Sequence, residues 1–104
     1  MSVMKIYGMK CREVMACAGS WALIAEAEVE LKNGEEVYVT LQKYNGVECT
    51  VSKESVYAFL AEDGEEPASE FVEEYTSLKE AKASKYADVF KVLNSMLGKL
   101  GKVG

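Results

Sequence analysis

The sequence predicts an α+β domain. An antiparallel β-meander of three to four strands fills the N-terminal half, and two or three C-terminal helices cover one face of the sheet. Two observations carry this prediction. Asn33-Gly34 and Asn45-Gly46 each lie between segments that alternate apolar and polar residues, which is typical of antiparallel strands joined by tight turns. In the C-terminal half the apolar period changes to the helical value of about 3.6 residues.

The alternation of apolar and polar residues predicts the register of the first hairpin. A two-residue loop at Asn33-Gly34 would pair Glu30 with Val37 and mix the buried and solvated faces of the sheet. A three-residue loop over 32–34 instead pairs Val29 with Val37 and leaves Gly34 in the left-handed position of a type I turn with a G1 bulge. The buried face of this strand then carries Trp21, Leu23, Ala25, Ala27, Val29 and Leu31.

The same construction applies to the second hairpin. A loop over 44–46 pairs Leu41 with Cys49 and Val39 with Val51. We therefore expect a meander with one apolar face. One further strand is expected within residues 1–20, whose methionines Met1, Met4, Met9 and Met15 suit either a core or an oligomer seam.

Helical patterns begin after residue 51. Ser52 is the expected N-cap of a short helix over 53–62 that carries Val56, Phe59 and Leu60. The only proline, Pro67, can occupy the first turn of a helix that carries Phe71, Val72 and Tyr75.

A capping box, Ser77-Leu78-Lys79-Glu80, predicts a new helix from about residue 78. The best amphipathic pattern runs over 85–100, and Lys82 would interrupt its apolar stripe, so a kink or a late start near Ser84 is expected. We interpret the stripe as the cover of the sheet rather than a partner-binding surface. It consists of Tyr86, Val89, Phe90, Leu93, Met96, Leu97 and Leu100.

Composition fits one domain over 1–104. The 104 residues are 49% hydrophobic, which suffices for a core without disulfides or metal. Histidine is absent and the three cysteines form no C-x-x-C pair, so neither a zinc site nor a disulfide framework is expected. We interpret Cys11, Cys17 and Cys49 as reduced and mostly buried; the sequence leaves open whether any of them is reactive.

Charge and hydropathy argue against nucleic-acid and membrane partners. The net charge is -5, and the lysine-rich segment 77–104 follows an acidic segment, 54–75, that has no basic residue. Val14-Met15-Ala16-Cys17 resembles a lipoprotein cleavage box, but Lys10, Arg12 and Glu13 interrupt the apolar stretch that a signal peptide needs. No segment approaches the roughly 18 apolar residues of a membrane span. We expect a soluble, cytoplasmic protein.

No catalytic, cofactor-binding or metal-binding residue can be assigned. The absence of histidine excludes Cys-His and Ser-His-Asp mechanisms, and no glycine-rich phosphate loop is present. The row Glu26, Glu28 and Glu30 is expected on a solvated outer face of the sheet. The next strand offers that row only Tyr38, Thr40 and Gln42, which add no matching metal ligands.

These observations favour a non-catalytic intracellular domain that acts through protein association, with a homodimer as the expected assembly. The alternative is a small-molecule-binding domain or an unconventional enzyme. Its pocket would lie between the sheet and the helices and would use Glu, Tyr or Cys side chains.

Overall fold

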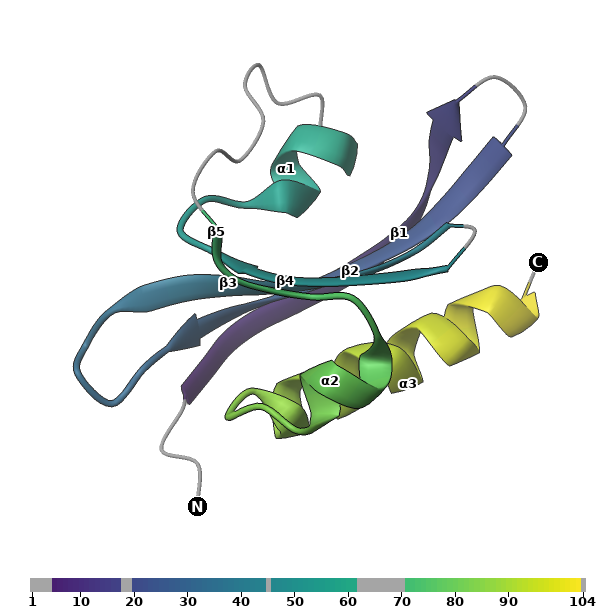
Figure 1. The fold of residues 1–104 in the computed structure, drawn as a ribbon. Coiled ribbons are helices and arrows are strands. Elements are labelled where there is room, and N and C mark those ends of the chain that lie inside the picture. Colours follow the sequence, from purple (N-terminus) through teal and green to yellow (C-terminus); the bar gives the residue numbers. More distant parts are fainter. Residues whose placement is uncertain (1–4, 18–19, 45, 62–70, 104) are drawn as a thin grey trace.

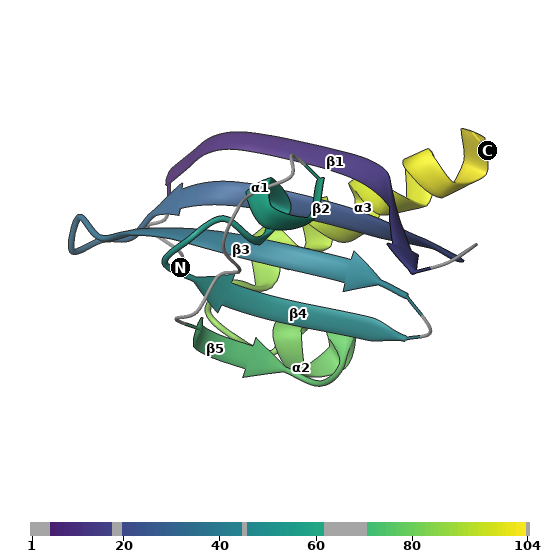
Figure 2. The same ribbon diagram turned by 90° about the horizontal axis from the view of Figure 1, so that it is seen from above.

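A computed structural model of the chain describes residues 5–17, 20–44, 46–61 and 71–103. One five-stranded antiparallel sheet separates a short helix on one face from two helices on the other (Figures 1 and 2). The elements are β1 (Lys5–Cys17), β2 (Ser20–Glu30), β3 (Glu36–Lys43), β4 (Val47–Ser52), α1 (Val56–Ala61), β5 (Phe71–Tyr75), α2 (Leu78–Lys82) and α3 (Ala87–Val103).

The strands follow one another in the order β1-β2-β3-β4-β5, so the sheet is a meander of five strands rather than three to four. The predicted register of the first hairpin is confirmed, with Val29 opposite Val37. Gly34 has a φ of 89°, and its amide donates to the carbonyl of Leu31 at 2.9 Å, which closes the turn. A residue with a Cβ would be strained there, so glycine fixes the loop length and thereby the register.

The second hairpin also has the predicted register. Leu41 lies opposite Cys49, Val39 lies opposite Val51, and Gly46 has a φ of 139°. Asn45 lies outside the described residues. Both hairpins therefore place their apolar residues on the same face of the sheet.

Helices α2 and α3 cover that face, as predicted for the C-terminal apolar stripe (Figure 1). The expected interruption near Ser84 is also present, because α2 ends at Lys82 and α3 begins at Ala87. The Ser84 hydroxyl donates to the Ala81 carbonyl at 2.6 Å and accepts from the Tyr86 amide at 3.1 Å. The core comprises Ala25, Ala27, Val29, Val37, Val39, Leu41, Cys49, Val51, Ala81, Tyr86, Val89, Phe90, Leu93 and Leu97.

The capping box is confirmed in one of its two bonds. The Ser77 hydroxyl accepts from the Glu80 amide at 3.1 Å. The Glu80 carboxylate binds one residue earlier than expected, since it accepts from the amide and the hydroxyl of Thr76 at 3.2 and 3.0 Å. The Ser77 hydroxyl therefore satisfies one amide of α2, whereas the Glu80 carboxylate binds Thr76 in place of the Ser77 amide.

The prediction of one apolar face and one solvated face is wrong. Helix α1 packs on the opposite face from α3, over a second small core that consists of Val14, Ala22, Ile24, Val56 and Tyr57 (Figure 1). Ser52 is the last residue of β4 and not the N-cap of this helix. That position belongs to Ser55, whose hydroxyl accepts from the Ala58 amide at 2.9 Å.

Two further expectations are corrected. Residues 71–75 form strand β5 and not a helix, because the exposed edge of β4 offers a pairing partner and the segment Phe-Val-Glu-Glu-Tyr suits a strand; Pro67 lies outside the described residues. Trp21 was expected on the buried face of the sheet. It has the alternation of that face but is 56% exposed. It pairs with Met15 near the tip of the β1–β2 hairpin and is not among the residues that pack against the core under α3.

We predict that Phe90→Ala lowers the free energy of unfolding by about 3–5 kcal/mol, and Leu93→Ala by about 2–5 kcal/mol, in urea denaturation. Both side chains are fully buried between α3 and the sheet. Lys91→Ala is the matched control on the exposed side of the same helix, with an expected change below about 0.5 kcal/mol. Equal effects of Phe90→Ala and Lys91→Ala would contradict the packing of α3 as the cover of the sheet.

Candidate functional site

Glu26 is the least expected side chain of the sheet. It lies on the face that carries α1 and is only 2% exposed, so the prediction of a solvated row does not hold for this residue. Glu28 and Glu30, farther along β2, are half-buried. Burying a carboxylate is costly unless donors replace its water, so the contacts of Glu26 explain its position.

Four donors surround the Glu26 carboxylate. Oε2 accepts from the Thr40 hydroxyl at 2.8 Å, and from the amides of Val56 and Tyr57 at 2.8 and 3.1 Å. Oε1 accepts from the Ser55 hydroxyl at 2.5 Å. The first two amides of α1 have no partner within the helix, and the carboxylate supplies one. Glu26 therefore fastens the start of α1 to the sheet.

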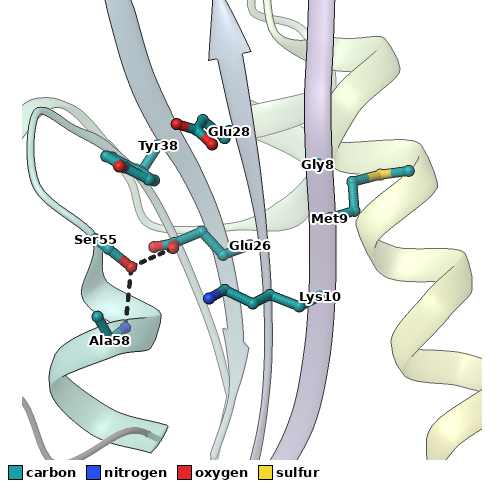
Figure 3. Close-up of a pocket in the computed structure, with 8 residues that line it drawn as sticks. All are labelled: Gly8, Met9, Lys10, Glu26, Glu28, Tyr38, Ser55 and Ala58. Atoms are coloured by element: carbon teal, nitrogen blue, oxygen red, sulfur yellow. Dashed lines mark hydrogen bonds between the residues drawn. The ribbon is translucent and has the colours of Figure 1, made fainter.

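A pocket of about 420 Å³ lies beside this contact, between the outer face of β1–β3 and the start of α1 (Figure 3). In Figure 3 the side chains of Lys10, Glu26, Glu28 and Tyr38 surround the hollow, whereas the side chain of Met9 points away from Glu26. The lining residues are Gly8, Met9, Lys10, Glu26, Glu28, Tyr38, Ser55 and Ala58.

The two ends of the pocket differ in charge. The Lys10 ammonium lies 4.7 Å from the centroid of the Tyr57 ring and is therefore held near α1. At the other end, Glu28 lies directly opposite Tyr38 in the strand register. Burial raises the pKa of Tyr38, and the charges of Glu28, Glu26 and Glu36 raise it further, while Lys10 acts against them. The Tyr38 hydroxyl is therefore neutral near pH 7, in a negative local field.

Sequence reasoning assigned no site residue and missed this grouping. The alternation of side chains along a strand places Glu26, Glu28 and Tyr38 on one face of the sheet. It does not predict that a helix packs over that face. The contribution of β1 to the pocket could not be predicted either, because a register shift between Ile6 and Gly8 breaks the alternation of side chains within that strand. The residue types match the Glu and Tyr groups of the alternative hypothesis, but their association depends on the packing of α1.

The outer edge of β1 is a second candidate site. Among the described residues, β1 pairs only with β2, so one side of this 13-residue strand has no strand partner. Exposed apolar side chains lie along it and at the adjoining start of β2. They are Ile6, Tyr7, Met9, Met15 and Trp21.

The two cysteines whose side chains are described differ in their surroundings. Cys49 is fully buried in the main core, and burial raises the pKa of its thiol to about 11. Cys11 is half-buried on β1. The structure therefore supports the structural interpretation of Cys49, because a protonated, enclosed thiol is a poor nucleophile.

In the described part of the chain, no three His, Cys, Asp or Glu side chains are grouped so as to hold a metal ion. None of its helices is long and apolar enough to cross a membrane.

We predict that Glu26→Leu lowers the free energy of unfolding by about 3 kcal/mol or more, because each buried donor left without an acceptor costs ~1–3 kcal/mol. Hydrogen exchange at the Val56 and Tyr57 amides should accelerate in the same variant. Glu28→Leu is the control, since the Glu28 carboxylate accepts no hydrogen bond from the described residues and lies two positions along the same strand face. Equal losses in the two variants would contradict the role of Glu26 as an anchor.

The Cys49 thiol should be protected in the folded protein. In a Cys11→Ser, Cys17→Ser variant, Cys49 is the only thiol, and we expect Ellman's reagent at pH 8 to react with it only as fast as the protein opens. The thiol remains protonated until the pH approaches about 11, so a rise from pH 7 to 9 should leave native protection in place. Rapid labelling without urea would show that Cys49 is accessible and reactive.

Comparison with known proteins gives no match: no family model fits the chain, and no curated protein or solved structure is significantly similar to it.

Proposed function

We propose that this protein is a non-catalytic association domain of the cytoplasm, and that its partner is a second copy of the same chain, bound edge to edge through β1. The observation that carries the proposal is the long outer edge of β1, which has no strand partner among the described residues. Backbone donors and acceptors on an open strand edge are self-complementary, and an exposed edge of this length readily pairs with another chain.

The exposed apolar residues support a partner on this edge. Met9 lies opposite Ala27, which is in the core under α3, so the Met9 side chain shares the face covered by α3. Met15 and Trp21 pair on that same face and are 60% and 56% exposed. Methionine and aromatic side chains of this kind are enriched at interfaces between proteins.

Helix α3 adds an apolar residue on the same side. The Phe90 ring meets the Tyr75 ring of β5 edge-on at 5.9 Å, so that flank of α3 points toward β5. Val92 follows two residues later, about 200° around the helix from Phe90, and therefore lies on the side of α3 away from the contact with Tyr75. Val92 is exposed. A second copy paired through β1 would bring the two α3 helices alongside the seam.

The register of the proposed pair follows from symmetry. Residues opposite each other in an antiparallel pair share a face, so a two-fold axis must pass at the level of a single residue. An axis at Cys11 would place Lys10 opposite Arg12 twice. An axis at Arg12 places Met9 opposite Met15 twice, and its one pair of like charges is Arg12 opposite Arg12 of the second copy. The second register is the better one, because cross-strand apolar pairs stabilise a sheet and facing like charges destabilise it.

The opposite edge of the sheet is a weaker candidate. Strand β5 has only five residues, and two of them are Glu73 and Glu74. Short, charged edge strands are a common protection against pairing.

Light scattering at micromolar concentration tests the proposal. We expect twice the mass of one chain for the native protein, and a shift toward the monomer for Met9→Lys and for Met15→Glu. Mixing these two variants should restore a dimer, because in the Arg12 register each mixed pair places a lysine opposite a glutamate and keeps one Met9–Met15 contact.

Val72→Glu is the control, since Val72 is an exposed apolar residue on β5. This variant should remain dimeric. A native protein that is monomeric at every concentration would remove the dimer proposal. Dissociation by Met9→Lys and Met15→Glu without recovery on mixing would reject the Arg12 register.

A further inference from the structure

The pocket beneath α1 contains an acidic side chain, Glu28, that has no hydrogen-bond donor among the described residues. Its ionisable residues Lys10, Glu26 and Glu28 give it a formal charge of -1. The Glu26 carboxylate already accepts four hydrogen bonds. The Glu28 carboxylate accepts none from the residues that the structure describes, so it is the acidic group that can receive a donor from a ligand.

The surroundings of Glu28 suit a positive charge. Tyr38 and Gly8 lie opposite Glu28 on the two neighbouring strands, so an aromatic ring and an open position flank the carboxylate. A Cβ placed on Gly8 would meet no atom within 4 Å, which leaves room for a ligand beside Glu28. Figure 3 shows the Glu28 carboxylate and the Tyr38 ring next to each other at the end of the pocket away from Lys10.

We propose that this pocket binds a small organic cation, an alkylammonium group whose charge lies between the Glu28 carboxylate and the Tyr38 ring. A carboxylate attracts the charge, and the face of an aromatic ring attracts the alkyl groups that carry it. Lys10 lies at the α1 end, 4.7 Å from the Tyr57 ring centroid, and so leaves the Glu28 end of the pocket negative. The pocket shares Gly8, Met9 and Lys10 of β1 with the proposed dimer seam, but the Met9 side chain points away from Glu26 (Figure 3).

Titration with tetramethylammonium chloride, followed by amide chemical shifts, tests the site. We expect saturable shifts at Gly8, Glu28 and Tyr38, beyond those given by sodium chloride at equal ionic strength. Glu28→Gln should weaken binding about fivefold or more, the loss expected for one unscreened charge contact at about 4 Å in water. Tyr38→Leu should also weaken binding while keeping the charge of the pocket.

Glu36→Gln is the matched control. Glu36 contributes to the negative field at Tyr38 but does not line the pocket, so this variant should lose much less affinity than Glu28→Gln. The proposal is overturned if tetramethylammonium produces no saturable shift, or if Glu28→Gln and Glu36→Gln bind it equally. Saturable shifts with sodium acetate in place of the cation would also overturn it and would identify an anion site near Lys10.

Discussion

The buried carboxylate of Glu26 is the contact that joins the sheet to the helix above it. Two of its donors are amides at the start of α1, one is the Ser55 hydroxyl of the preceding turn, and one is the Thr40 hydroxyl of β3. The carboxylate therefore connects two neighbouring strands to a segment about thirty residues later. Without it, these donors would be buried with no acceptor, which costs more than the hydrogen bonds themselves contribute. The position of α1, and with it the pocket beside Ser55, depends on this group.

The two hairpins could be predicted in detail because their determinants are local. Each glycine with a positive φ fixes a loop length, and the alternation of apolar residues allows only one register for that loop. The same holds for the break between α2 and α3, where Ser84 supplies hydrogen bonds to both sides. In such segments, turn chemistry and hydrophobic pattern agree, and the local sequence is sufficient to predict the structure.

The elements that sequence reasoning missed depend on contacts between distant segments. Residues 71–75 become a strand because β4 presents an open edge, and nothing within those five residues shows that edge. Likewise, Glu26 alternates with the apolar residues of its strand, as an exposed residue would. It is buried only because the start of α1, at Val56, packs over it. The candidate pocket could not be predicted for the same reason, since Lys10, Tyr38 and Ser55 come from three separate elements.

Helix α1 shows how little of a short helix need be specified by its own residues. Its six residues, Val56–Ala61, are far fewer than the ~12–15 at which an isolated helix becomes even marginally stable in water. The segment has no acidic residue in its first turn, so it lacks the usual complement to the helix dipole within its own sequence. That negative charge is supplied by β2 instead. The helical state of residues 56–61 is thus encoded partly at position 26, and divergence of the sequence at either place is constrained by the other.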